Sequence, residues 1–354
     1  MNNIVDIMYN DATKAGIPLG GTFELTPLCN MNCKMCYIRM TKAEMESQGR
    51  LKTAAEWLKL AQEAKEAGML FLLLTGGEPF LYPEFWELYG ELKEMGFFIS
   101  INSNGTMLEG ETLERLIKNP PYRINITLYG GSDKTYSELC GNEKGFFAAT
   151  EAIKKLKNAG VFVKLNGSIT PYNIMDTEKC FDFAKETQVP IEIGTYMFPP
   201  MRRENKSSDR LSPEDAGRYS AIIDKIRYDD KTILDRTEAM SECLAGGSKT
   251  AMPSKFSCRA GRSSFWVNWK GEMTPCGMFE LFKENPFEIG FAESWRRIKE
   301  NIDNCTVLSG CVNCDKRDVC RVCPAIAYAE TGSFNEKPEY LCRYTESRMR
   351  GFLK

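Results

Sequence analysis

Three cysteines near the start of the chain have a spacing that suits an iron–sulfur cluster. They lie within Pro27–Tyr37 in the pattern Cys29-x3-Cys33-x2-Cys36. A cubane 4Fe–4S cluster takes one thiolate on each iron, so three thiolates leave the fourth iron open to an exogenous ligand. A zinc ion with a distant fourth ligand is the alternative, but the spacing does not match the paired cysteines of zinc sites. These residues therefore favour a cluster that does chemistry.

A second set of cysteines occupies the C-terminal part of the chain. Cys258 and Cys276 form the pattern C-x12-G-x4-C, and the later members follow as C-x2-C-x5-C-x2-C and one last cysteine: Cys311, Cys314, Cys320, Cys323 and Cys342. Zinc ribbons also contain paired cysteines, but their pairs are usually about 15–20 residues apart, far more than here. This set predicts a small domain stabilised by its metal centres.

The composition restricts the chemistry of these sites. The 354 residues include 14 cysteines and no histidine, which excludes Ser–His and Cys–His catalysis and leaves sulfur and oxygen as metal ligands. The N-terminus lacks the features of a signal peptide, so we expect a cytoplasmic protein with reduced thiols. The net charge of −2 and the lack of a long apolar run argue against nucleic acid and membranes as partners. Cys140 and Cys180 are expected to be small buried hydrophobic residues.

Alternating strands and helices must position the first three cysteines. Apolar runs predict strands at about 22–26, 69–75, 97–102, 123–128, 161–169 and 191–196. Helices are expected near 53–67, 84–95, 111–118, 145–159 and 176–187. Strands that alternate with helices imply parallel βα units, and six units predict an α/β fold with a partial (β/α)6 TIM-like barrel. Chemistry in such barrels occurs at the C-terminal ends of the strands, where Cys29 lies.

We predict four regions along the chain. An N-terminal segment, 1–20, precedes the barrel at 21–200. A helical linker, 201–255, opens with the polar run 201–210 and continues as a helical stretch near 213–240. A small cysteine-rich domain covers 256–354.

The Cys29–Cys36 loop, after the first strand of a βα barrel, resembles the radical SAM superfamily. The resemblance implies that S-adenosylmethionine (SAM) binds the open iron of a 4Fe–4S cluster. One electron then splits SAM into methionine and a 5′-deoxyadenosyl radical, which abstracts hydrogen from a substrate. It further implies catalytic roles for Cys29, Cys33 and Cys36. Met35 would lie near the adenine, and Tyr37 would pack against the cluster loop.

The ends of later strands agree with this resemblance. The segment Thr75–Pro79 is similar to the family's GGEP segment near the SAM amino group, with glycines that allow close approach: Gly76, Gly77, Glu78 and Pro79. Ser103 and Asn104 are similar to a polar segment near the SAM ribose and carboxylate. Three further positions are candidate SAM contacts: Asn166, Ser168 and Tyr196. Ordinary turns and core packing are the alternatives for these later positions.

The C-terminal cysteines resemble the SPASM domain, which binds auxiliary 4Fe–4S clusters, although one gap is two residues where the family has three. Two such clusters need eight ligands, and the pattern supplies seven. The resemblance assigns to a distal cluster Cys311, Cys314, Cys320 and Cys342. It assigns to a proximal cluster Cys258, Cys276 and Cys323. The fourth proximal ligand is Cys305, Cys243 or none, with the iron then open to substrate.

Relatives with a SPASM domain most often act on peptide or protein side chains. The resemblance therefore implies an oxidative modification such as a crosslink in a ribosomal peptide, with flavodoxin or ferredoxin as a suitable electron donor. The alternatives are a small metabolite or cofactor precursor such as a haem-like tetrapyrrole, formylglycine formation in sulfatases, and a zinc-bound interaction protein. Gly277 stands where sulfatase maturases carry a carboxylate, which weakens the sulfatase alternative. About 20 residues precede the first strand, so we expect a separate protein or the barrel mouth to bind any leader peptide.

Overall fold

The structure of the chain is a computed structural model that describes residues 4–199, 209–244, 256, 258–305, 311 and 314–353. It forms two compact units. The first unit comprises Met1–Gly167, Met175–Glu192 and Cys258–Asp303, and the second comprises Ser168–Ile174, Ile193–Ser257 and Asn304–Lys354. The predicted linker lies partly outside the described residues, which lack 200–208 and most of 245–257.

The described strands form an eight-stranded sheet in the order β6-β5-β4-β3-β2-β1-β7-β8. Their bounds are β1 Gly20–Glu24, β2 Phe71–Thr75, β3 Phe98–Ser103, β4 Arg123–Thr127, β5 Val163–Ser168, β6 Ile191–Gly194, β7 Ser264–Val267 and β8 Met273–Thr274. Strands β1 to β5 pair in parallel in chain order. The predicted partial barrel is therefore confirmed. Strand β7 extends it beside β1 in parallel, and β8 pairs with β7 in antiparallel fashion.

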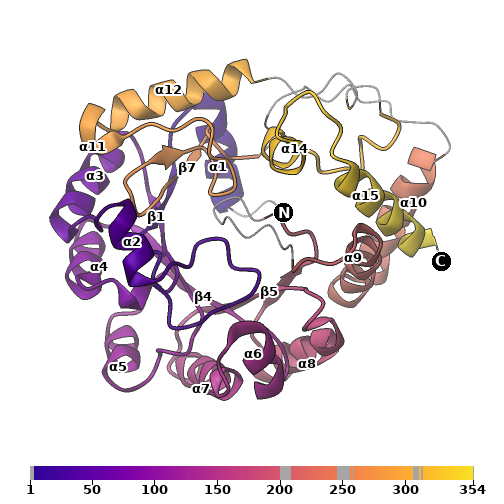
Figure 1. Ribbon diagram of the computed structural model, residues 1–354, viewed down its shortest axis with the longest axis horizontal. Coiled ribbons are helices and arrows are strands. Elements are labelled where there is room, and N and C mark those ends of the chain that lie inside the picture. The colour runs from indigo at the N-terminus through magenta and orange to yellow at the C-terminus, as the bar shows by residue number, and fades with distance from the viewer. Residues whose placement is uncertain are drawn as a thin grey trace. The chain divides into compact units, whose positions relative to one another are not determined.

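Helices of the first unit lie along the outside of these strands, as Figure 1 shows for α3, α4, α5 and α7. The described helices of this unit before β7 are α1 Ile4–Ala15, α2 Lys42–Gln48, α3 Ala54–Glu66, α4 Phe85–Glu94, α5 Gly110–Lys118, α6 Asp133–Cys140, α7 Gly145–Asn158 and α8 Thr177–Thr187. After β8 follow α11 Pro286–Ile289 and α12 Phe291–Asn304. A capping box begins α3, where Thr53 and Glu56 each accept a backbone N–H of the other.

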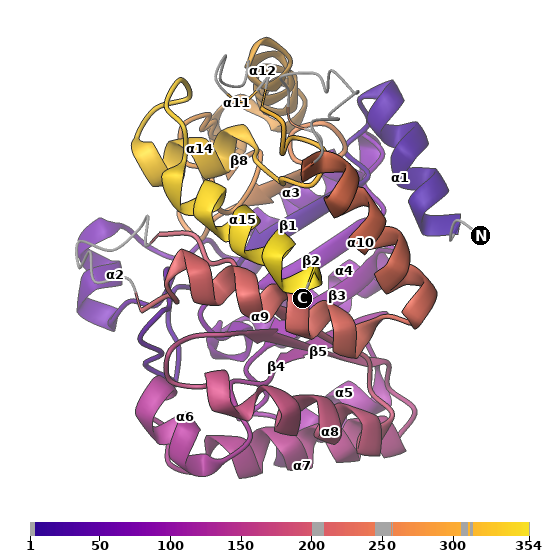
Figure 2. The ribbon, with the colours of Figure 1, turned by 90° about the vertical axis from the view of Figure 1, so that its right-hand side faces the viewer.

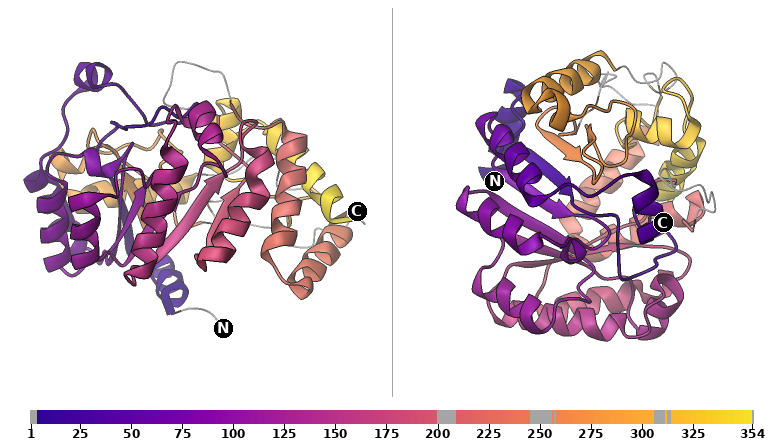
Figure 3. Two further views of the ribbon diagram at one scale, coloured as in Figure 1. Left: turned by 90° about the horizontal axis from the view of Figure 1, so that it is seen from below. Right: turned by 60° about the vertical axis from the view of Figure 1, so that its left-hand side comes forward.

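The two faces of the sheet differ sharply in polarity. In β3 and β4 the residues Ile99, Ile101, Ile124 and Ile126 are fully buried. Because side chains alternate between the faces of a strand, Ser100, Asn102, Arg123 and Asn125 lie on the opposite, inner face. These two strands are therefore not apolar on both sides, and they present polar side chains to the interior of the barrel. Helix α1 lies at the end of the barrel where the strands begin, below them in the left panel of Figure 3.

Helices dominate the described part of the second unit. The predicted stretch near 213–240 forms two helices, α9 Pro213–Arg227 and α10 Asp230–Leu244. They accompany α14 Pro324–Thr331 and α15 Glu339–Leu353, and Figure 2 shows α9, α10 and α15 close together. A Cβ at Gly217 of α9 would overlap the carbonyl oxygen of Tyr344 in α15, so glycine allows this close helix contact.

A buried ion pair joins the two ends of the second unit. Arg210 forms two hydrogen bonds with the carboxylate of Glu330, at 2.7 and 2.9 Å, and its guanidinium lies 3.7 Å from the ring centre of Tyr340. A bidentate pair fixes the relative orientation of its two groups as well as attracting them. This pair therefore holds the chain before α9 against α14. None of the described helices is long and apolar enough to cross a bilayer.

Candidate iron–sulfur and cofactor sites

The main chain just after β2 holds one side of the loop that carries Cys29, Cys33 and Cys36. The N–H of Gly77 donates to the carbonyl of Thr26 at 2.7 Å, and the N–H of Glu78 donates to the carbonyl of Leu28 at 2.8 Å. Backbone bonds of this kind are independent of the side chains on the loop. The cysteine loop is therefore positioned by the ends of two neighbouring parallel strands.

The C-terminal end of α6 holds the other side of the loop. The N–H groups of Asn32 and Lys34 donate to the carbonyls of Cys140 and Leu139, at 2.8 and 3.0 Å. Carbonyls at a helix end lack partners within the helix, so the loop satisfies them while α6 orders the loop. The buried thiol of Cys140 also hydrogen-bonds with Cys33. Cys140 is buried as predicted, yet it touches a predicted cluster ligand.

The three loop thiols are buried or half-buried, and two of them accept a backbone N–H. Cys29 accepts the N–H of Met31 at 3.4 Å, and Cys36 accepts the N–H of Arg39 at 3.3 Å. Burial raises the pKa of Cys29 to about 12, although the Met31 N–H opposes this. A cluster ligand must be a thiolate, so metal binding must displace this proton. No described set of three cysteines and carboxylates converges as ligands of one metal ion would.

The two glycines of the TGGEP segment are required by the cysteine loop itself. A Cβ at Gly76 would lie 2.5 Å from the carbonyl oxygen of Thr26, and a Cβ at Gly77 would overlap the carbonyl of Leu28. Real Cβ atoms do not approach backbone oxygens so closely. The glycines thus let β2 approach the loop before Cys29, which is a structural reason for them beyond access to a bound ligand.

Glu78 is a fully buried carboxylate that links the ends of β2 and β3. It accepts the N–H of Asn104 at 2.9 Å and the hydroxyl of Ser103 at 3.0 Å. Burial raises the pKa of Glu78 to about 7, and the Asn104 N–H opposes that shift. The carboxylate therefore organises Ser103 and Asn104, which we predicted as SAM contacts.

Ionisation of Glu78 should lower the free energy of unfolding as the pH rises from about 5 to about 8. Because its pKa rises from 4.5 to about 7 on folding, its contribution is fully present below the lower value and is lost as the pH passes the higher one. The shift corresponds to about 3 kcal/mol. The variant Glu78→Gln cannot ionise, so its free energy of unfolding should lack this loss. Chemical denaturation of both anaerobic proteins across this range measures the difference, and parallel profiles would contradict the prediction.

Asn104 connects this carboxylate to the cysteine loop. Its side-chain amide donates to Asn30 at 2.8 Å and to the sulfur of Cys29 at 3.7 Å. Asn30 in turn donates to the hydroxyl of Thr106 at 2.8 Å. Sequence reasoning missed Asn30 and Thr106, because the local pattern gives little sign of them. Asn30 is a polar residue between two cysteines, and Thr106 follows an Asn-Gly turn. The structure thus brings Glu78, Ser103 and Asn104 to Cys29.

The other predicted SAM contacts are less closely tied to this group. Met35 and Tyr37 are half-buried in the loop, and Pro79 is buried at the first position of a short 3₁₀ helix. Asn166 lies on β5 opposite Thr127 and is half-buried. Their roles toward SAM stay predictions.

Ser168 and Tyr196 belong to the second unit. The carbonyl of Ser168 accepts the side-chain amide of Asn173 at 2.9 Å. The hydroxyl of Tyr196 donates to Glu330 at 2.7 Å, and its ring packs against a buried cluster of the same unit. The contact of Tyr196 with adenine stays a prediction.

Four C-terminal cysteines line one small cavity in the second unit. The cavity has a volume of about 30 Å³, and its walls include Cys311, Cys314, Cys320 and Cys342. The positive side chains Lys316, Arg317 and Lys337 also line it, and a cluster with four thiolates would present negative charge to them. These are the four residues that we predicted for the distal cluster. Their thiols and the positively charged lining suit the chemistry of that group.

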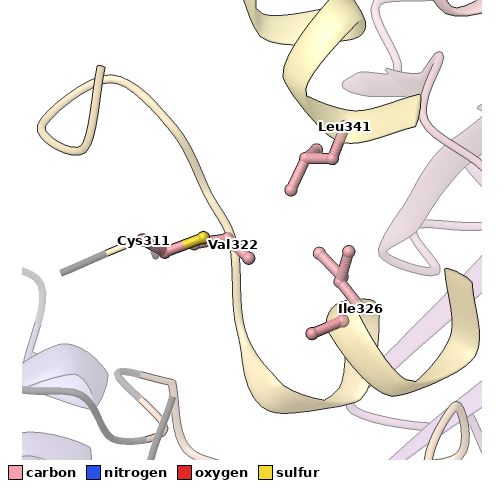
Figure 4. Close-up of a cluster of buried hydrophobic side chains, with 5 residues drawn as sticks. Cys311, Val322, Ile326 and Leu341 are labelled. Carbon is pink, nitrogen blue, oxygen red and sulfur yellow. The ribbon is translucent and has the colours of Figure 1, made fainter. Parts of the chain in front are cut away.

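A small apolar core supports this cavity. Cys311, Val322, Ile326 and Leu341 are buried together with Ala327, and Figure 4 shows the four labelled side chains pointing toward a common centre. Cys320 and Cys323 pack against this core from its edge. The cavity is therefore backed by packed side chains on α14 and α15.

The predicted proximal ligands are divided between the two units. Cys258 is exposed and Cys276 is half-buried in the first unit, where the sulfur of Cys276 accepts the N–H of Met278 at 3.4 Å. Cys323 precedes α14 in the second unit. Cys305 and Cys243 are both buried, and the Cys243 thiol donates to the carbonyl of Asp315 at 2.8 Å. The fourth ligand stays open.

Comparison with known proteins bears on the cysteine loop and its neighbours. Residues 23–184, which include the loop and the ends of β1 to β3, match the Radical SAM superfamily. The chain carries a radical SAM domain. The loop thiols with their N–H donors and the close approach at Gly76 and Gly77 fit the cluster and SAM that enzymes of this superfamily use.

Relatives of this chain differ in the activities that their names give. The chain is 27% identical to the "AdoMet-dependent heme synthase" of Methanosarcina barkeri, a match that covers 91% of this chain and 95% of the relative. It is 25% identical to the "Antilisterial bacteriocin subtilosin biosynthesis protein AlbA" of Bacillus subtilis, covering 74% and 56%. The fold is similar to Streptococcus suis SuiB bound to precursor peptide SuiA, with a TM-score of 0.71, 17% identity and coverage of 96% and 82%.

Gly277 stands where sulfatase maturases carry a carboxylate, and Trp266 of β7 occupies the space beside it. A Cβ at Gly277 would lie 2.8 Å from the indole of Trp266, so a larger residue has no room there. The indole N–H of Trp266 donates at 3.0 Å to Glu24, a fully buried carboxylate at the end of β1. The first unit therefore has a fully buried carboxylate, Glu24, hydrogen-bonded to the indole that lies beside Gly277.

Proposed function

We propose that this radical SAM enzyme oxidises a peptide or protein side chain, for example by forming a crosslink. When bound, the cluster and SAM supply a 5′-deoxyadenosyl radical that removes one hydrogen atom from the substrate. Oxidation of the resulting substrate radical must release a further electron and a proton. The four-cysteine cavity of the second unit carries the proposal, because an auxiliary cluster there would accept that electron.

Three groups of residues share the work in this proposal. Cys29, Cys33 and Cys36 hold the SAM-binding cluster, while the TGGEP segment and Asn104 order the loop around it. The four cavity cysteines hold the distal auxiliary cluster. Cys258, Cys276 and Cys323 are proposed for the proximal one. A flavodoxin or ferredoxin would supply the first electron, and a separate protein would present a leader peptide.

Relatives named for peptide chemistry support the peptide substrate. One is AlbA, a bacteriocin biosynthesis protein, and another protein of similar fold, SuiB, is known with its precursor peptide bound. Formylglycine formation is less favoured, because Trp266 occupies the space that a carboxylate at 277 would need.

A second candidate substrate is a haem-like tetrapyrrole. The specific observation in its favour is the length of the match to the haem synthase, which extends over 95% of that relative. The match to AlbA extends over only 56% of that protein. Oxidative removal of a carboxyl group from a tetrapyrrole would also release one electron after hydrogen abstraction. The two candidate functions therefore differ in their substrate and not in the use of the clusters.

Anaerobic incubation with SAM and a strong reductant tests the choice. Mass spectrometry of short cysteine-rich peptides encoded near the gene should show the loss of two hydrogen atoms per crosslink, together with 5′-deoxyadenosine. Iron coproporphyrin III, tested in parallel, should be unchanged. Decarboxylation of the porphyrin with no change in any peptide would replace the proposal by the second candidate. A variant without the three loop cysteines is the control for both substrates.

A further inference from the structure

A cavity of about 420 Å³ lies in the first unit where the strands begin. Its walls come from α1 and from the first residues of β1, β2 and β4, together with Ser100 and Arg259. The loop with Cys29 follows the opposite end of β1, roughly 15 Å along the strand. Pockets for small molecules usually measure about 300–1,000 Å³, so the cavity has room for a ligand separate from SAM.

Arg123 gives this cavity a positive charge that lacks a partner. Its side chain makes no hydrogen bond or ion pair within the described residues, and its Nε atom is buried. The second arginine of the wall, Arg259, already pairs with Asp6 at 2.8 Å and lies 3.8 Å from the ring centre of Tyr9. The half-buried guanidinium thus has a buried N–H donor at Nε without a partner, which an anion bound beside it would satisfy.

Asn125 adds an unpaired acceptor on the same face of β4. The residue is 6% exposed, and its amide nitrogen donates to Asn102 at 2.7 Å. Its oxygen Oδ1 is buried and has no hydrogen-bond partner. Because Asn125 stands two residues after Arg123, the two side chains present a cationic donor and a neutral acceptor side by side, roughly 7 Å apart along the strand. Buried polar atoms of this kind require a partner.

The opposite wall is aromatic with a polar tip. Tyr9 of α1 stacks on Phe71 with 5.6 Å between the ring centres. Its hydroxyl lies so close to Gly20 that a Cβ there would overlap it, so the glycine makes room for the tyrosine. Hydroxyls of Thr22 and Ser100 also line the cavity, as does Asp6, whose carboxylate pairs with Arg259. A ligand in this cavity would thus meet donors, acceptors and an apolar ring face.

We propose that this cavity binds a small organic anion, a carboxylate or a phosphate ester, that also carries a hydroxyl or ammonium group. The anionic group pairs with Arg123. The hydroxyl or ammonium group donates to Oδ1 of Asn125. The site is separate from the radical chemistry, and it would let a metabolite bind this enzyme without occupying the SAM site.

Calorimetric titration of the anaerobic holoenzyme with three probes tests the site. L-malate carries both features, succinate lacks the hydroxyl, and inorganic phosphate represents the phosphate class. We expect malate or phosphate to bind, and Arg123→Met to weaken binding at least about tenfold. Asn125→Leu should weaken malate about tenfold and succinate less than about twofold. No binding of any probe at about 10 mM, as for a cavity that holds only water, would overturn the proposal.

A matched variant and a stability measurement guard against a trivial loss of fold. Arg115→Met removes a surface arginine on α5 outside the cavity and should leave all affinities unchanged. Arg123→Met should raise the melting temperature of the ligand-free protein, because it removes a half-buried guanidinium whose buried Nε lacks a partner. A lower melting temperature of Arg123→Met, combined with unchanged affinity of that variant for the probes, would show that the arginine is structural and refute the site.

Discussion

Replacing Cys29, Cys33 and Cys36 together by alanine should reduce formation of 5′-deoxyadenosine to below detection. Without these thiolates no cluster can present an open iron to SAM. The loop itself should keep its place, because main-chain bonds to Thr26, Leu28 and the end of α6 hold it. Iron and labile sulfide should fall only by the content of one cluster, since the cysteine-lined cavity of the second unit is untouched.

A buried cysteine outside the site is the matched control. Cys180 lies in α8 and is 4% exposed. Its replacement by alanine removes one buried thiol as well, yet it should leave SAM cleavage and iron content unchanged. Electron paramagnetic resonance of the reduced proteins separates the clusters. Continued cleavage of SAM by the triple variant would refute the assignment of the radical site to this loop.

Gly77→Ala should cost both stability and SAM cleavage. The new methyl group would overlap the Leu28 carbonyl, a backbone atom that cannot rotate away. Overpacking of this kind usually costs about 1–3 kcal/mol. Because Leu28 directly precedes Cys29, relief of the overlap must shift the loop thiols as well. We therefore expect lower iron content in the loop cluster and a fall in the rate of SAM cleavage of at least about tenfold.

The same substitution in a helix provides the control. A Cβ at Gly90 of α4 would meet no atom within 4 Å. Gly90→Ala should therefore stabilise the protein by about 0.5–1 kcal/mol through helix propensity, with SAM cleavage unchanged. Urea denaturation and the cleavage assay on both variants measure the contrast. Equal stability of Gly77→Ala and the parent protein would mean that the backbone approach is not tight.

Apolar runs in the sequence predicted strands β1 to β6, but they did not predict β7 and β8. Five predicted helices agree with the structure to within one or two residues at each end, because caps and glycines mark them in the chain. The first strand was displaced, running Gly20–Glu24 where we predicted about 22–26. Glycine has low strand propensity, yet a Cβ at Gly21 would lie 2.5 Å from Phe265 of β7. This glycine serves a contact with a strand more than 200 residues away.

The spacing of the cysteines predicted an iron–sulfur site from the sequence alone, and the resemblance of the loop to the radical SAM superfamily implied its chemistry. Ligand spacing within a short loop is a local property, so a linear pattern contains it. Only the tertiary structure showed that Glu78 is buried among Ser103 and Asn104, that Cys140 contacts Cys33, and that the four C-terminal cysteines share one cavity. Those contacts join residues far apart in the chain. Burial and partner choice are set by the packing of whole elements, which a linear pattern does not contain.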